Sequence, residues 1–134
     1  MPQKPDDQTL MVEMIFPEQA NHYGTLFGGN ALSLMARAAF VAATRRAQGA
    51  VVMARSEQVD FTTPVRVGEL LELRAEITRM GRSSLSVAVT GIAEEMGTGN
   101  RREALNGRFE MVAVDASGRP HALNENTSRK EETA

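Results

Sequence analysis

The spacing of apolar residues along the chain predicts five β-strands and one long helix. Apolar side chains at every second position are typical of a strand, and the clearest case is 83–93, where Leu85, Val87 and Val89 alternate with polar or small neighbours. A Gly-rich stretch at 97–100 predicts a turn between the last two strands. The predicted strands are 9–16, 51–61, 69–78, 83–93 and 103–114.

The helix is predicted over 30–49. Nearly every position in 31–43 is apolar or small, with Ser33 and Arg37 as exceptions, so no single apolar stripe stands out. Such a pattern indicates a helix that is buried on most sides. Asn30 is the predicted N-terminal cap, with a glycine pair leading into the helix.

The order of these elements favours an α+β fold. One helix cannot provide the crossovers that several parallel strands need, so the last four strands are expected to pair antiparallel through short turns. A curved antiparallel sheet wrapped around one buried helix is the economical solution. The expected domain spans 9–114, after a loose start at 1–8 and before a polar, partly disordered tail at 115–134.

Composition narrows the possible chemistry. The chain has 134 residues and no cysteine, which suits one domain with a real core and removes disulfides, thiolate zinc sites and a cysteine nucleophile. No His, Asp and Glu residues have metal-ligand spacing. The net charge of -2, the single tyrosine and the lack of tryptophan give no reason to expect nucleic acid or membrane as partners. The polar N-terminus is not a signal peptide, so a cytoplasmic protein is expected.

A polar loop before the helix carries the first candidate site. It contains Asn21, Gly24 and the pair Gly28 and Gly29. Paired glycines let a ligand approach the backbone closely, and the free N–H groups of a helix start can face a polarised carbonyl oxygen. That arrangement would serve as an oxyanion hole in acyl transfer or hydrolysis. On these residues alone, a plain tight turn is an equally good interpretation.

Three segments together resemble the acyl-CoA thioesterase branch of the hotdog superfamily. They are N-x-x-G-x-x-F-G-G from Asn21 to Gly29, VDFTTPVRVGE at 59–69, and GRSS at 81–84. The resemblance covers about 9–114 and implies a hotdog fold, a curved antiparallel sheet around a central helix. It implies hydrolysis of acyl-CoA to free acid and CoA, with no cofactor because the CoA thioester is the substrate. It also implies a homodimer that shares its sites, and allows the dimers to assemble into a hexamer.

The resemblance assigns roles to individual residues. Asn21 corresponds to the Asn that positions water or substrate, and the glycine pair belongs to the substrate-binding loop. Arg82 is a candidate for the CoA phosphates, and Ser83 and Ser84 are candidates for the pantetheine amides, although a surface arginine and a satisfied strand edge are equally simple interpretations. The catalytic acid of the family lies seven residues after the second glycine, and that position is Ala36 here.

A methyl group can neither accept a proton nor attack a thioester, so Ala36 leaves three interpretations open. The chain can carry an engineered Asp→Ala or Glu→Ala change. It can be a naturally silent relative that binds or senses acyl-CoA without cleaving it. Alternatively, another carboxylate substitutes, with Asp60, Glu57 and Glu18 as candidates. A base at His22 is conceivable too, but an exposed loop histidine is the simpler interpretation.

Overall fold

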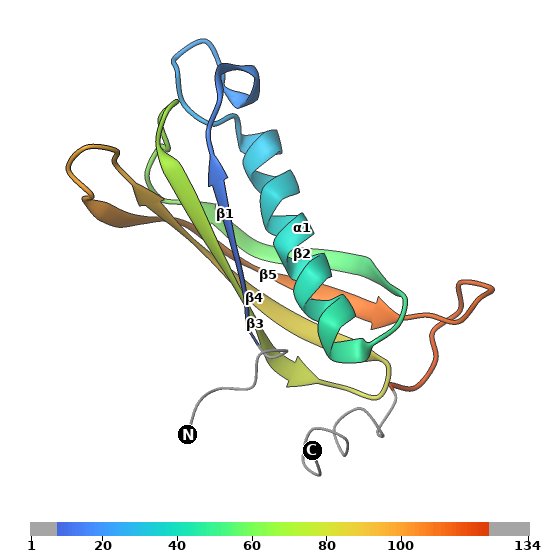
Figure 1. Ribbon diagram of the computed structural model, residues 1–134. Coiled ribbons are helices and arrows are strands. Elements are labelled where there is room, and N and C mark those ends of the chain that lie inside the picture. The colour runs from blue at the N-terminus through green and yellow to red at the C-terminus, as the bar shows by residue number, and fades with distance from the viewer. Residues whose placement is uncertain (1–7, 124–134) are drawn as a thin grey trace, which may run out of the picture.

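The computed structural model describes residues 8–123 as a curved five-stranded sheet wrapped around one long helix (Figure 1). The strands run in the order β1-β3-β4-β5-β2, and every neighbouring pair is antiparallel. The elements are β1 (Gln8–Met14), the 3-10 helix η2 (Pro17–Gln19), α1 (Gly28–Ala47), β2 (Val51–Phe61), β3 (Leu70–Met80), β4 (Ser84–Glu94) and β5 (Arg101–Ala113). The predicted α+β fold class is confirmed, and each predicted strand overlaps the observed one.

The chain crosses the sheet twice before the last three strands fill its middle. From β1 at one edge, α1 carries the chain over the concave face to β2 at the other edge. The connection 62–69 must then return to β3, which pairs with β1. Strands lie about 4.8 Å apart, so this connection crosses roughly 14 Å along one end of the sheet. It therefore passes beside the start of α1 (Figure 1).

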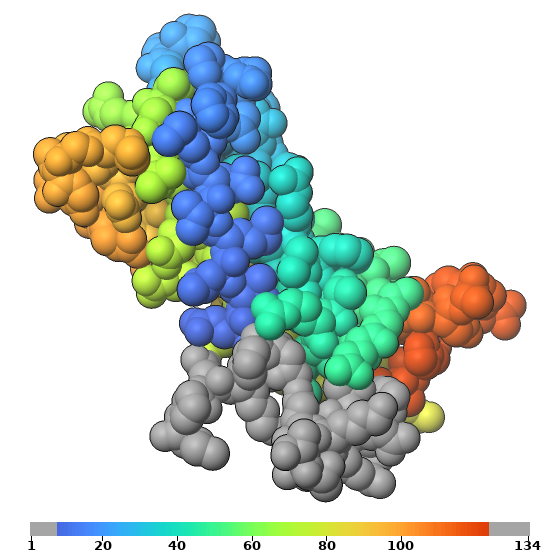
Figure 2. All heavy atoms as spheres, viewed as in Figure 1, coloured from blue at the N-terminus to red at the C-terminus, as the bar shows by residue number. Residues whose placement is uncertain are grey.

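Small side chains on α1 let the helix lie close to the sheet. Its buried positions are mostly alanines, and they face large apolar residues on the strands such as Leu73, Val87 and Phe109. Gly107 on β5 leaves room for this packing, because a Cβ there would lie 3.2 Å from the Met35 side chain of α1 and 2.9 Å from Val59 of β2. Figure 2 shows α1 beside β1 across one face of the molecule.

Two predictions about α1 are wrong. The helix is not buried on most sides of the single chain, because Leu32, Arg37 and Phe40 lie exposed along one face. The apolar pattern could not reveal this, since apolar residues suit a subunit contact as well as a core. The helix also begins at Gly28, with Phe27 as a cap that makes no side-chain hydrogen bond. Asn30 instead donates from Nδ2 to the carbonyl of Gln19 at 2.9 Å.

Part of the predicted tail is folded. Residues 115–123 turn back beside β5, where the amide of His121 donates to the carbonyl of Ala113. The amide of Leu123 donates to the carbonyl of Arg82 at 2.8 Å, and the Leu123 side chain packs against the core. Gln8, the last residue of the predicted loose start, instead begins β1. Residues 1–7 and 124–134, which hold the rest of that start and the predicted disordered end, lie outside the described residues. Among residues 8–123, no helix is long and apolar enough to cross a membrane.

Candidate functional site

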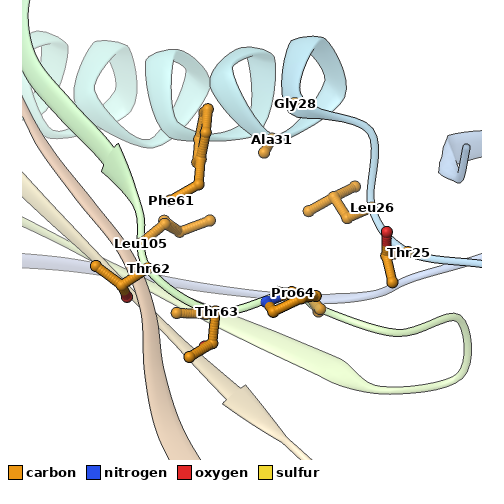
Figure 3. Close-up of a pocket in the computed structure, with 11 residues that line it drawn as sticks. Thr25, Leu26, Gly28, Ala31, Phe61, Thr62, Thr63, Pro64 and Leu105 are labelled. Carbon is orange, nitrogen blue, oxygen red and sulfur yellow. The ribbon is translucent and has the colours of Figure 1, made fainter.

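A cavity of about 260 Å³ lies where α1 begins (Figure 3). Its walls come from four segments that are distant in sequence: the loop before α1, the first turn of α1, the end of β2 with the 62–69 connection, and β5. Phe61 rises toward the helix, while Leu26 and Leu105 close the sides. The lining is mainly apolar, and threonines line part of it. The cavity therefore suits a small apolar group that enters beside the helix start.

The start of α1 presents backbone donors at this cavity. The first intrahelical hydrogen bond runs from the amide of Ala31 to the carbonyl of Phe27 at 2.9 Å, so the three preceding amides have no partner within the helix. Their partial positive charge favours an oxygen that carries negative charge. Gly28 lines the cavity. At Gly29 a Cβ would lie 2.9 Å from the Phe27 ring, so a side chain there would displace the aromatic ring.

Asn21 organises the loop that leads to the helix. Its Oδ1 accepts hydrogen bonds from the amides of Tyr23 at 3.0 Å and Thr25 at 3.2 Å, and from the Thr25 hydroxyl at 3.2 Å. The backbone amide of Asn21 donates to the carbonyl of Thr25 at 2.9 Å. No group in the described part of the chain accepts a hydrogen bond from its Nδ2, so this donor is available to a ligand.

The 62–69 connection forms a platform under that loop. The amide of Leu26 donates to the carbonyl of Val65 at 2.7 Å, and the amide of Val67 donates to the carbonyl of Gly24 at 3.0 Å. At its other end, the amide of Thr62 donates to the carbonyl of Ala104 on β5 at 2.8 Å. The connection thus joins the Asn21 loop to the sheet.

An ion pair between the buried Glu69 and the partly exposed Arg102 holds this platform, and sequence reasoning missed it. The guanidinium of Arg102 donates to both carboxylate oxygens of Glu69, at 2.8 and 3.1 Å, and to the carbonyl of Pro64 at 2.6 Å. The hydrogen bond from Arg102 holds the pKa of Glu69 below its ordinary value, against the opposing effect of burial. Glu69 ends the VDFTTPVRVGE segment, which was the only sequence signal for its importance.

Ala36 lies half-buried at the border of the exposed face of α1. Neither nearby strand carboxylate reaches it within one chain. Asp60 lies opposite Asn106 in the register of β2 and β5, and Glu57 lies opposite Arg108, with which it forms an ion pair. Both carboxylates lie on the sheet face that points away from α1. Glu18 is an exposed residue of η2. The described residues of the single chain therefore contain no substitute among these three for a carboxylate at position 36.

The remaining predicted residues lie at the opposite end of α1. Arg82, Ser83 and Ser84 form the turn between β3 and β4, near the C-terminal end of the helix (Figure 1). The carbonyl of Ser83 accepts from the amide of Ala113 at 2.8 Å. A helix of 20 residues is about 30 Å long, so one chain does not bring this turn together with Asn21.

His22 and His121 add no catalytic group at either end of α1. His22 is exposed and lies beside Tyr23, with ring centres 4.0 Å apart. His121 is exposed in the segment after β5. Within residues 8–123, no three side chains of the metal-ligating types come together.

Residues 23–100 match the sequence model of a family described as the Thioesterase superfamily. The chain belongs to this superfamily. It is 30% identical over 122 residues to the acyl-CoA thioester hydrolase YciA of Escherichia coli, covering 89% of this chain and 92% of YciA. The resemblance to hotdog-fold acyl-CoA thioesterases is confirmed, and the chain is a member of a family of thioester hydrolases.

Solved structures of superfamily members share the fold. An apo-hexameric acyl-CoA thioesterase is 34% identical, with a TM-score of 0.85 over 96% of this chain and 86% of that chain. The acyl-CoA hydrolase of Staphylococcus aureus, solved with butyryl coenzyme A, is 25% identical, with a TM-score of 0.83 over 96% of this chain and 82% of that chain. The same hydrolase has been solved as an Asp→Ala mutant.

Proposed function

We propose that this chain is an acyl-CoA thioesterase whose hydrolytic step is impaired by Ala36. The observation that carries the proposal is the apolar cavity at the start of α1, beside free backbone amides and the glycine pair. The thioester carbonyl oxygen lies against these amides, and they stabilise the negative charge that forms on it in the tetrahedral intermediate. The free Nδ2 of Asn21 orients the water or the substrate.

The cavity takes the acyl chain. Its volume of about 260 Å³ is slightly below the roughly 300–1,000 Å³ of pockets that hold whole drug-sized ligands. It therefore suits a short acyl group, while the rest of CoA lies outside. The butyryl coenzyme A bound to the Staphylococcus aureus hydrolase supports this choice of ligand. No cofactor takes part, because the CoA thioester is itself the substrate, and the cysteine-free chain suits the cytoplasm.

The full site requires a homodimer. Arg82, Ser83 and Ser84 bind CoA only if a second chain brings them to the helix start of the first. The exposed face of α1 and the edge strand β2 leave an apolar surface for that contact, with Leu32, Phe40, Met53 and Phe61 between 37% and 52% exposed. A second apolar row on the other edge strand, at Leu10, Val12 and Met14, would serve assembly of dimers into a hexamer.

In this proposal, the active form of the enzyme from which this chain derives carries Asp or Glu at position 36. That carboxylate would either take a proton from water or attack the thioester carbon directly. Ala36 removes this group without removing the binding features around it. The Staphylococcus aureus hydrolase keeps its fold as an Asp→Ala mutant, which supports the view that such a change leaves the structure intact.

A second candidate function follows from the same residue. If Ala36 is natural, the chain is an acyl-CoA-binding or acyl-CoA-sensing protein. The cavity and donors would then hold the ligand without cleaving it. This candidate differs from the first in turnover and not in binding.

Two assays on the chain as it stands separate these functions. Calorimetry with butyryl-CoA and longer acyl-CoAs tests binding, and thiol release from the same panel tests hydrolysis. Slow but saturable thiol release supports the impaired thioesterase. Saturable binding with no release above the uncatalysed rate supports the binding protein, and no binding of any acyl-CoA contradicts both.

A further inference from the structure

The 62–69 connection needs anchors because it crosses the end of the sheet without being a strand. Its residues form most of one cavity wall and carry the loop of Asn21. Backbone hydrogen bonds at Thr62 and Thr63 fix its beginning on β5. Its end is fixed by backbone hydrogen bonds between Ile15 and both Gly68 and Glu69. Between Pro64 and Gly68, its fixed points are side-chain contacts and pairing with the Asn21 loop.

Arg102 and Glu69 supply those side-chain contacts. Arg102 reaches from β5 to the carbonyl of Pro64 at 2.6 Å and simultaneously binds Glu69 through two nitrogens. Glu69 in turn accepts the amide of Arg66 at 2.8 Å. The pair therefore binds the backbone of the connection on both sides of Val65, at Pro64 and at Arg66. The Glu69 side chain is 6% exposed and that of Arg102 is 33% exposed, so the carboxylate is shielded from water while the guanidinium is partly solvated.

The part of the connection that this ion pair holds also forms part of the proposed substrate site. Pro64 and Val65 line the cavity. The Val65 carbonyl accepts the amide of Leu26, which lies two residues before the glycine pair, and Val67 donates to the carbonyl of Gly24 in the Asn21 loop. A shift of the connection would move the cavity wall and the Asn21 loop together. A displacement near 1 Å is enough to reduce binding or reaction substantially in a preorganised site.

We propose that Glu69 and Arg102 are positioning residues for the thioester, setting the cavity wall and the Asn21 loop through the 62–69 connection. This inference rests on the proposed function. An ion pair of this kind often adds little net stability. A planar guanidinium that binds a carboxylate and a carbonyl at once fixes their geometry, so we expect the pair to position the connection as well as to stabilise the fold. Lysine cannot reproduce that fork.

The neighbouring Arg101 provides a matched control. It also donates to two carboxylates, Glu72 at 3.1 Å and Glu94 at 2.6 Å, and it belongs to the same strand. It lines no part of the cavity and makes no hydrogen bond to the 62–69 connection. Arg101→Lys therefore removes an arginine fork of the same kind at a place where the proposal expects no effect on the ligand.

The experiment compares Arg102→Lys, Glu69→Gln and Arg101→Lys with the parent chain by two readouts. Calorimetry gives affinities for butyryl-CoA and for free CoA, whose ratio reports the acyl and thioester contacts alone. Hydrogen exchange follows the amides of Leu26 and Val67. For Arg102→Lys and Glu69→Gln we expect about tenfold weaker butyryl-CoA binding, free CoA affinity within about twofold, and about tenfold faster exchange at both amides. Arg101→Lys should change none of these.

Several results would overturn the proposal. Unchanged exchange and an unchanged affinity ratio in both site variants would show that the pair positions nothing. An equal loss for both ligands, with exchange faster throughout the chain, would show a stability effect only. If Arg102→Lys does not fold, Glu69→Gln decides, since glutamine keeps the size of the side chain but replaces one of the two acceptor oxygens with an NH2 group that cannot accept from Arg102. If the parent binds no acyl-CoA, the proposed function fails, and exchange at the two amides still decides whether the pair holds the loop.

Discussion

The two ends of α1 are built differently, although the sequence places family signatures at both. At the N-terminal end, four distant segments are joined by backbone and side-chain hydrogen bonds around a cavity. At the C-terminal end, backbone hydrogen bonds within the described part of the chain join the turn 81–84 to the end of β5 and to Leu123. One end is thus a preformed pocket, whereas the other is a surface turn, for which the proposed function requires a second chain.

In the proposed function, each chain carries all the signatures but only half of a site. About 30 Å of helix separates the two ends of α1, so the proposed acyl-CoA ligand would contact both sets of residues only if a second chain placed its turn 81–84 beside the helix start of the first. The exposed face of α1, which contains Ala36, is where that second chain would lie. The predictions below test the two ends separately.

The largest expected effect comes from filling the cavity. Ala31 is 3% exposed and points into the cavity, so Ala31→Leu should exclude the acyl chain (Figure 3). Excluding three alkyl carbons at about 0.8 kcal/mol each predicts roughly 50-fold weaker butyryl-CoA binding, measured by calorimetry. Ala47→Leu, the same change at the other end of α1, is the control. Equal losses in both variants would contradict the difference between the ends.

The next effect concerns stability as a function of pH. Because the pKa of Glu69 is lowered from 4.5 in the folded state, its contribution is fully present above about pH 4.5 and is lost as pH falls through the folded pKa. We expect Glu69→Gln to cost about 2 kcal/mol of unfolding free energy at pH 7, less than a fully buried pair because Arg102 is partly exposed. Urea unfolding from pH 7 to pH 3 should show this difference shrinking below pH 4.5. A difference that grows on acidification would contradict the assignment.

The smallest effect is expected at the other end of the helix. Arg82 is exposed, so its contact with a CoA phosphate is screened by water. Arg82→Ala should weaken free CoA and butyryl-CoA about fivefold each, and leave their affinity ratio unchanged. Arg79→Ala, at a nearby exposed arginine of β3, is the control. A changed ratio would place Arg82 at the acyl group instead.

Local patterns allowed much of this molecule to be predicted. The strands follow from apolar periodicity, and α1 follows from its long run of apolar and small residues after the glycine pair. The Glu69–Arg102 ion pair could not be predicted in this way, because its two residues are 33 positions apart and no local pattern at either one indicates the other. The exposed face of α1 was missed because apolar residues do not reveal whether they face the same chain or a second one.

The central claim is that the chain binds the thioester but lacks the group that cleaves it. The direct test is thiol release from butyryl-CoA by Ala36→Asp, by the parent chain, and by Ala36→Asn, which matches the size of Asp but cannot act as a base. A regained general base should raise the rate by about 10²–10⁴-fold in Ala36→Asp only. If Ala36→Asp folds, binds butyryl-CoA and releases thiol no faster than the parent, position 36 is not the missing catalytic site.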